Sequence, residues 1–529
     1  MTAATGHASR GRLTDAGLLL VGMAAAALLA VALVKRTGQA ELALTVLIAA
    51  ALVVTAVRKR HALARLGATR LLGWVALLMP LAALIGPALA PPGLQSLFAF
   101  RLLLGLAAAL LVALLLAAPA TARWRVPRYL VLFGLWFVWL VASLIWAADK
   151  PAGFRYLVVL ATMLALTVAT TFAGTTHRRL KILMVTMGIA YALTIAVTLL
   201  ESFAGFRLST SALVNATGSR SLSVTAFYFN QNDLATYLTI AWAFLLTVFL
   251  FTRRRGWQVL TLAGLGFGLF AFVHTGSRSS LLVIGLETVA LAPLLLRVSS
   301  RRAARAIAVV AVVVVAGLGV LAFNNSSNPT LKQFNLTNLV TSAQQGVGSG
   351  ATRLDLTRFA FTLTGRSYLL GVGPGNAEPR VKQLTGDPSD LGNLHDWWLE
   401  VLVDGGLPAL VLYLVIYFGL AGAMFRVARR ARVALTRYLA ISVLVALVGY
   451  AVGCLGPSTA IGFAPMWILF GLALAVIVRA ENEAHERTAT IDGRSPGADD
   501  GPGGKIDTGR AELPARAGET GRQPERAPA

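Results

Sequence analysis

The sequence predicts an all-α, polytopic membrane protein, and three observations lead to this fold class. Hydrophobic residues make up 57% of the 529-residue chain, and charged residues only 13%. Apolar runs long enough to cross roughly 30 Å of hydrocarbon recur along the sequence. Lys and Arg gather in alternate connections between these runs. Since lipid offers no partner for backbone N–H and C=O groups, such runs are expected to be helices that satisfy those groups internally.

Hydropathy predicts about fourteen spans in one helical bundle. The first eleven cover residues 13–34, 40–57, 71–90, 98–118, 129–147, 154–172, 182–203, 234–251, 257–273, 281–296 and 304–323. The last three cover residues 397–425, 435–454 and 460–478. The predicted transmembrane domain is therefore residues 1–479, and it includes a large extracytoplasmic loop, residues 324–396, between the eleventh and twelfth spans.

The basic residues orient this bundle, because Lys and Arg beside a span tend to stay in the cytoplasm. With a cytoplasmic N-terminus, the inner connections hold basic clusters at residues 58–70, 123–128, 178–181, 253–255, 297–305 and 426–437. The net charge of +24 is thus mainly a topology signal and an attraction to anionic headgroups, not a nucleic-acid surface. The expected location is the cytoplasmic membrane, with segments 205–232, 274–278 and 324–396 outside.

The C-terminal segment 480–529 differs in composition from the rest of the chain. It is rich in Gly, Pro, Arg and acidic residues and has few large apolar side chains, so it cannot bury enough surface to offset the entropy of ordering. We expect a disordered cytoplasmic tail. The single cysteine, Cys454, lies in an apolar run, which excludes an intramolecular disulfide and favours a packing role.

The polar stretch 371–410 holds the most informative chemistry among the outer segments. His395 precedes an apolar helix that begins with Trp397 and Trp398, and an imidazole there can remove a proton from a hydroxyl at neutral pH. The alternative is a polar residue beside an interfacial aromatic belt. Asp396 is placed to orient or acidify such a site, or to be a solvated carboxylate at a helix end.

Arginines on the outer side break the cytoplasmic preference and call for another explanation. Arg278 is confined to a very short turn between two predicted spans, where phosphate binding and headgroup anchoring are equally good explanations. Arg220, Arg353, Arg358, Arg366 and Arg380 also lie outside, and for each of them a solvated role is the default.

Other motifs are less specific. The run GVGPGN, residues 371–376, lacks the Lys-Ser/Thr of a P-loop, and its glycines and proline instead predict a tight turn that folds the loop back toward the membrane. Glu287 lies within a predicted span and is a candidate functional carboxylate without an assigned partner. There is no metal-binding motif, so no metal and no cofactor are expected.

Four segments resemble the O-antigen ligase and polymerase superfamily of membrane glycosyltransferases, often called the Wzy/WaaL group. In chain order they are FYFNQNDLATYL (227–238), HTGSRSSLL (274–282), TRLDLTRFAFTLTGRSYLLGVGPGN (352–376) and HDWWLEVLVDGGLPALVLYL (395–414). Their order around one large outer loop is more specific than any single motif.

The resemblance implies metal-independent transfer of a glycan from undecaprenyl diphosphate to an acceptor hydroxyl at the outer face of the cytoplasmic membrane. It implies that Arg220 and Arg278 hold the diphosphate and that His395 is the base or positions the acceptor, which makes these three the catalytic candidates. Arg353, Asn232 and Asp396 are the implied substrate-binding residues. The family commonly has Asn after the histidine, where this chain has Asp396.

The expected partners are the lipid-linked glycan donor, a glycan, lipid or protein acceptor, and membrane lipids. Ligase, polymerase and protein O-oligosaccharyltransferase activities all fit the motifs. A polysaccharide or polyprenyl-lipid transporter is the alternative, although apart from Glu287 the predicted span interiors lack the charged residues that line such a path. A non-catalytic scaffold in envelope synthesis is the third possibility.

Overall fold

The computed structural model describes residues 67–90, 98–117, 127–216, 223–252, 254–296, 335, 341, 349–385, 394–457 and 460–491. Within these ranges the chain forms α-helices and short 3-10 helices and contains no β-strand. The chain divides into two compact units, Met1–Glu481 and Asn482–Ala529. The bundle described below belongs to the first unit.

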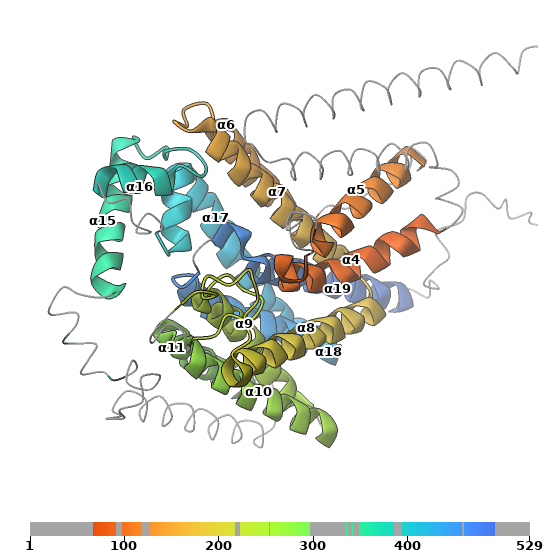
Figure 1. Ribbon diagram of the computed structural model, residues 1–529. Helices are drawn as coiled ribbons and strands as arrows, with labels where there is room; N and C mark the ends of the chain where they lie inside the picture. Colours follow the sequence, from red (N-terminus) through yellow and green to blue (C-terminus); the bar gives the residue numbers. More distant parts are fainter. Residues whose placement is uncertain are drawn as a thin grey trace, which may run out of the picture. The chain divides into compact units, whose positions relative to one another are not determined.

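Of the thirteen described α-helices, eleven coincide with predicted spans, whereas the two in residues 349–385 lie within the predicted loop 324–396. The thirteen are α4 (Ala68–Ile85), α5 (Ala99–Ala117), α6 (Arg128–Ser143), α7 (Lys150–Ala173), α8 (His177–Ala204), α9 (Gln231–Phe251), α10 (Arg255–Thr275), α11 (Arg278–Leu296), α15 (Ser349–Arg366), α16 (Ala377–Thr385), α17 (Trp397–Arg430), α18 (Ala434–Gly453) and α19 (Ala464–Ile491). Two 3-10 helices, η1 (Gly86–Leu89) and η4 (Ala460–Gly462), complete the set (Figure 1).

Eight of the described helices are long and apolar enough to cross a membrane, so the chain is a multi-pass membrane protein. The apolar stretches Ala99–Leu114, in α5, and Arg128–Ser143, which is α6, are shorter. Predicted spans 13–34, 40–57 and 304–323 lie outside the described residues, and the total of about fourteen therefore stays a prediction. Part of the predicted 480–529 tail is helical, because α19 continues to Ile491, while the remainder lies outside the described residues.

Short polar side chains and glycines define the ends of several helices. Asp149, Thr176 and Asn230 are N-caps of α7, α8 and α9, and each side chain accepts a hydrogen bond from a first-turn backbone N–H. Such caps satisfy donors that have no intrahelical partner. Gly276 ends α10 in a left-handed conformation, with φ of 68°, so the chain reverses at once into α11.

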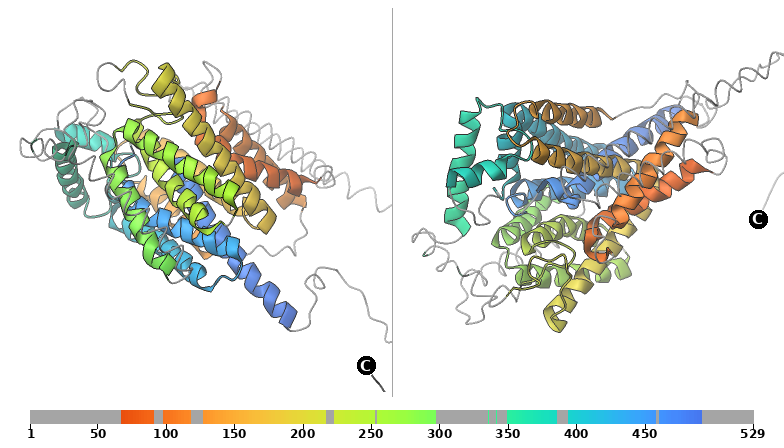
Figure 2. Two further views of the ribbon diagram at one scale, coloured as in Figure 1. Left: turned by 90° about the horizontal axis from the view of Figure 1, so that it is seen from below. Right: turned by 45° about the horizontal axis from the view of Figure 1, so that its top comes forward.

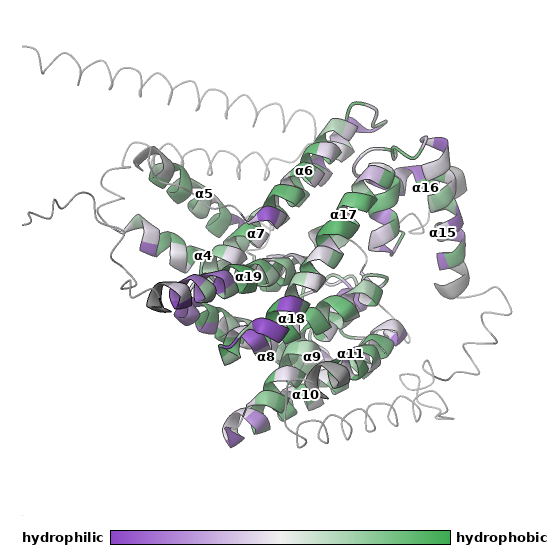
Figure 3. Ribbon diagram, turned by 180° about the vertical axis from the view of Figure 1, so that it is seen from behind, coloured by the Kyte–Doolittle hydropathy of each residue, from purple (hydrophilic) through white to green (hydrophobic). Residues whose placement is uncertain are grey.

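The centre of the bundle is packed with aromatic side chains. Trp136 of α6, Trp397 and Tyr413 of α17 and Trp467 of α19 are completely buried. The Trp136 ring lies 6.4 Å from that of Trp397 and 5.5 Å from that of Tyr413. Its indole nitrogen donates a 3.1 Å hydrogen bond to the carbonyl of Ala409, so this large side chain is buried without losing a polar partner. Along the helices hydrophobic residues predominate (Figure 3).

Helices α15 and α16 and the loop between them, residues 349–385, form a structure that we call the cap. It lies at one end of α17, with α15 running across the direction of that helix (Figures 1 and 2). A separate apolar cluster joins the cap to the first turns of α17, and it includes Leu356, Leu363, Val381 and Val403. The cap therefore has its own small core above the start of α17.

Candidate functional site

The beginning of α17 is fixed by hydrogen bonds to the end of α18. Asp396 is the N-cap of α17 and accepts from the N–H groups of Trp398, at 2.9 Å, and Leu399, at 3.3 Å. The N–H of Trp397 donates to the carbonyl of Cys454 at 3.3 Å, and the indole N–H of Trp398 donates to the carbonyl of Ala451 at 3.0 Å. The segment that carries His395 is thus held at two helix termini.

His395 lies immediately before this cap in an unusual backbone conformation. Its φ is 49°, a left-handed conformation that costs a residue with a side chain roughly 1–2 kcal/mol. Its ring hydrogen-bonds the backbone of Pro457, and because proline has no N–H, the partner is the carbonyl oxygen. The surrounding structure holds the imidazole in one place at the cost of local strain, a feature that clusters at functional sites.

The surroundings of His395 favour its neutral form. Burial, and then the charge of Arg353, lower the pKa of His395 from its ordinary value of 6.5, while the Pro457 carbonyl and Glu378 act in the opposite direction. A histidine that is neutral at pH 7 can accept a proton from a hydroxyl. The predicted role as a general base is consistent with this environment and stays a prediction.

Arg278 and Arg353 come from distant parts of the chain and lie near one another. Arg278 is the first residue of α11 and is exposed, whereas Arg353 is on α15. Partial desolvation, and then the like charge of Arg353, lower the pKa of Arg278 from its ordinary value. Among the described residues neither guanidinium has a carboxylate within 4.0 Å. Two neighbouring guanidiniums without an acidic partner form a site that favours an anion.

Arg353 interacts electrostatically both with Arg278 and with the segment that holds His395 and Asp396. Its charge acts on Arg278, on His395 and on Asp396, whose pKa burial raises while Arg353 and the two capping N–H groups lower it. The structure therefore places the start of α11 and the start of α17 within range of the charge of Arg353, near the start of α15. Arg220, the remaining predicted catalytic residue, lies outside the described residues.

The other two predicted substrate-binding residues have structural positions in the same region. Asn232 is in the first turn of α9, and its carbonyl accepts from Thr236 Oγ1 at 2.9 Å. This turn lies against Gly456, next to Pro457. Asp396 is occupied as a cap, and since Asp and Asn are about equally good N-caps, the difference from the common family residue preserves that function.

The GVGPGN run is a packed turn, as predicted. Gly371, Gly373 and Gly375 have φ of 82°, 95° and 67°. A Cβ on Gly371 would collide with the backbone of Gly405 and Gly406, and one on Gly373 would collide with Ala147. The predicted tight turn is confirmed, and the close backbone approach gives these glycines a packing role.

This turn repairs a break in α17. Gly406 has non-helical φ and ψ, and Pro408 has no N–H to give to the carbonyl of Asp404. In place of the missing helical bonds, Val372 N–H donates to the carbonyl of Val403 at 2.8 Å and Gly373 N–H to that of Asp404 at 3.0 Å, while Leu407 N–H donates to Leu369 at 2.8 Å. The kink and the cap therefore depend on one another.

Sequence reasoning did not assign Asp404, which holds the cap to α17. Its Oδ1 accepts from the N–H groups of Asn376, at 3.1 Å, and Ala377, at 2.8 Å, where α16 begins. Asn376 in turn accepts at Oδ1 from the N–H of Asp149, at 2.8 Å. The signal in the sequence was a carboxylate followed by Gly-Gly-Leu-Pro inside an apolar run.

Glu201 and Glu287 are among the carboxyl groups buried elsewhere in the bundle. Glu201 of α8 accepts from the N–H groups of Thr225, at 2.7 Å, and Ala226, at 2.9 Å, and so fixes the segment that precedes α9. Glu287 is fully buried with neither side-chain oxygen hydrogen-bonded, and it faces Gly449 of α18. In the part of the chain that the structure describes, no three His, Cys, Asp or Glu side chains are grouped to hold a metal ion.

The fold defines a multi-pass helical membrane protein, and its candidate site combines Arg278 and His395 with Arg353 of the cap. Residues 263–414 match the family model described as O-antigen ligase. The chain is also similar to the teichuronic acid biosynthesis protein TuaE of Bacillus subtilis (strain 168), with 26% identity over 402 residues, which cover 73% of this chain and 79% of that protein. The two matches support assignment of the chain to an O-antigen ligase/polymerase-like family, with a membrane function in joining or polymerising glycans.

Proposed function

We propose that this protein transfers a glycan from undecaprenyl diphosphate to an acceptor hydroxyl, without a metal ion, at the outer face of the cytoplasmic membrane. The observation that carries the proposal is that Arg353, near the start of α15 in the cap, acts by its charge on both Arg278, the first residue of α11, and His395, two residues before α17. All three lie at or near helix N-termini, whose backbone N–H groups also favour anions.

The proposed chemistry divides the site between the leaving group and the acceptor. Arg278 and Arg353, with Arg220 from segment 205–232, bind the diphosphate and stabilise the negative charge that grows on it as the glycosidic bond breaks. His395 removes the proton from the attacking hydroxyl. Direct attack by that hydroxyl inverts the anomeric carbon and releases undecaprenyl diphosphate.

The role of a polymerase or ligase of a cell-surface glycan is supported by the similarity to TuaE, a protein named for teichuronic acid biosynthesis. In this proposal both termini are cytoplasmic and the cap is extracytoplasmic, an orientation supported by the basic connections. A glycan, a lipid or a protein can provide the acceptor hydroxyl.

The decisive experiment separates binding of the donor lipid from transfer. Arg278→Ala and His395→Ala proteins would be purified, reconstituted in liposomes and tested for binding of undecaprenyl diphosphate and, in a deletion strain, for length and attachment of the surface glycan. We expect Arg278→Ala to lose both binding and glycan, and His395→Ala to lose glycan while it retains binding.

Arg358→Ala is the matched control, because Arg358 is on the same helix as Arg353 but is 80% exposed and pairs with Asp355 at 3.2 Å. It should leave binding and glycan unchanged. Normal glycan from well-expressed Arg278→Ala and His395→Ala proteins would exclude the proposed reaction. Loss of transfer on addition of EDTA would exclude its metal independence.

A further inference from the structure

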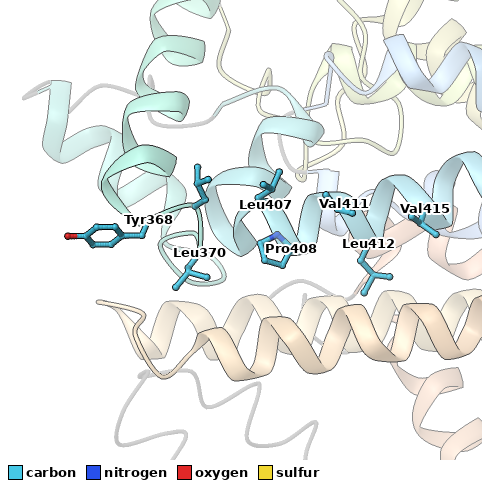
Figure 4. A pocket seen from close by; sticks show the side chains of 8 residues that line it. Tyr368, Leu370, Leu407, Pro408, Val411, Leu412 and Val415 are labelled. Carbon is cyan, nitrogen blue, oxygen red and sulfur yellow. The ribbon is translucent and has the colours of Figure 1, made fainter.

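An apolar groove lies where the loop after α15 meets the kink of α17, away from the candidate site. It has a volume of about 460 Å³ and is lined by Leu369 and Leu370 of the loop and by Leu407, Pro408, Val411 and Val415 of α17. Figure 4 shows these side chains along one edge of α17, with Tyr368 at the end of the row. The groove thus has one wall on a membrane-spanning helix and one on the cap.

The wall of the groove formed by the loop after α15 exposes large side chains, and two of these residues have the left-handed backbone conformation that favours glycine. Tyr368 is 89% exposed, Leu369 49% and Leu370 44%, although Tyr368 and Leu369 have φ of 52° and 63°. Leu369 N–H donates to the carbonyl of Thr364 at 3.0 Å, which is the hydrogen bond of a helix C-terminus usually completed by glycine. The chain keeps a tyrosine and a leucine there at an energetic cost, which points to a use for their exposed side chains.

The other wall continues the surface of a candidate membrane span. Val411 and Val415 of α17 are 50% and 53% exposed and lie one helical turn apart on the same face. In a bilayer such a face meets hydrocarbon. Because the groove is continuous with this face, a hydrocarbon chain alongside α17 can extend into it.

Two exposed aromatic residues belong to or contact the loop that forms one wall of the groove. Trp146, 40% exposed, donates its indole N–H to the carbonyl of Gly371 at 3.0 Å, three residues after the exposed Tyr368. Tyrosine and tryptophan favour the boundary between hydrocarbon and water. These two side chains therefore favour a position of the loop in the headgroup region.

We propose that this groove binds an acyl chain of a membrane phospholipid, with Tyr368 in the headgroup region, and so anchors the cap to the bilayer. A phospholipid fits better than the polyprenyl chain of a donor, since none of the described residues that line the groove is cationic. Arg353 lies more than three turns before the end of α15, roughly 20 Å along its axis. The contact would set the height of the cap, and hence of Arg353, above the membrane.

Site-directed spin labelling tests this directly, because the chain's one cysteine, Cys454, is buried and should not react in the folded protein. Leu370→Cys and Leu407→Cys probe the two walls, and Gln383→Cys, on an exposed position of α16, is the aqueous control. Each labelled protein is reconstituted in phosphatidylethanolamine and phosphatidylglycerol, and collisions of the label with oxygen and with a water-soluble nickel chelate are compared.

We expect the oxygen-to-nickel collision ratio at both groove positions to be several-fold higher than at Gln383. A ratio at Leu370 equal to that at Gln383 would overturn the proposal, and Leu407 provides an independent reading if the Leu370 variant folds poorly. A high oxygen-to-nickel ratio that arises only after addition of undecaprenyl diphosphate would also overturn the proposal, since the occupant of the groove would then be a polyprenyl chain. Wild-type protein treated with the same label should carry no spin label, and this control establishes that the signal comes from the introduced cysteine.

Discussion

The indole N–H of Trp398 donates a 3.0 Å hydrogen bond to the carbonyl oxygen of Ala451. The N–H of Trp397 reaches the carbonyl of Cys454, and the His395 ring reaches that of Pro457. Residues at the start of α17 thus donate to one carbonyl in the last turn of α18, that of Ala451, and to one just beyond that helix, that of Cys454. The position of His395 is consequently determined by the contact between two helix termini.

Replacing Trp398 with Phe should test this contact. The change removes one N–H donor and keeps most of the ring, so we expect a loss of about 1 kcal/mol in the free energy of unfolding. Transfer should fall while undecaprenyl diphosphate binding is retained, because the altered residue positions His395 and not the arginines. Thermal unfolding in detergent and glycan profiling measure the two effects. Trp74→Phe, at a 54% exposed position, should change neither.

The pH dependence of transfer should follow the neutral fraction of His395. A general base works when it is unprotonated, so the rate should fall as the pH decreases through the lowered pKa of His395, with a midpoint below the ordinary value of 6.5. Initial rates in proteoliposomes between pH 5 and 8, the range in which histidine commonly titrates, would reveal this midpoint. A rate independent of pH in this range would contradict the role of base.

Two charge-removing substitutions should move that midpoint in opposite directions. Arg353 lowers the pKa of His395 and Glu378 raises it. Arg353→Gln should therefore shift the acidic limb of the profile to higher pH, and Glu378→Gln should shift it to lower pH. Shifts of the same sign in both variants would show that another group controls the limb, whatever the effect of either substitution on the maximum rate.

Asp404 should be important for stability because it anchors the cap to α17. Asp404→Ala leaves the N–H groups of Asn376 and Ala377 without their acceptor, which should cost about 2–4 kcal/mol in total. Asp404→Asn keeps an acceptor oxygen and should cost less. Asp355→Ala, at an exposed ion pair on α15, should cost under about 1 kcal/mol. Thermal unfolding combined with limited proteolysis of the cap would measure these differences.

The sequence was sufficient to predict the helices and the polar segments that meet, for reasons that are local. Apolar runs such as residues 234–251 and 435–454 coincide with α9 and α18, because a span must satisfy its own backbone and remain apolar throughout. His395 and Arg278 were recognisable because each is polar at the edge of such a run. Their proximity to Arg353 could not be predicted from the sequence, since it depends on how α11, α15 and α17 pack.

The roles of Asp404 and Asp396 required the structure for a different reason. From the sequence alone, an acidic residue that is exposed to solvent cannot be distinguished from one that caps a helix or one that is catalytic. Asp404 becomes interpretable only once the break at Gly406 and Pro408 leaves carbonyls that the GVGPGN turn satisfies. The sequence predicted that turn from its glycines, but the helix segment that it contacts is about thirty residues further along the chain and is not encoded locally.

Gly449 should be intolerant of a side chain because of Glu287. A Cβ at Gly449 would collide with the carboxyl oxygen of Glu287 across the α11–α18 contact, so Gly449→Ala should cost about 1–3 kcal/mol through overpacking. In a Glu287→Ala background the same substitution should cost less, since the obstructing group is gone, and a double-mutant cycle measures the difference. Gly266→Ala on α10, where a Cβ meets open space, should stabilise its helix by up to about 1 kcal/mol. If Gly449→Ala proved equally benign in both backgrounds, the Glu287 carboxyl group would not lie against Gly449 of α18 and would have to face another part of the bundle.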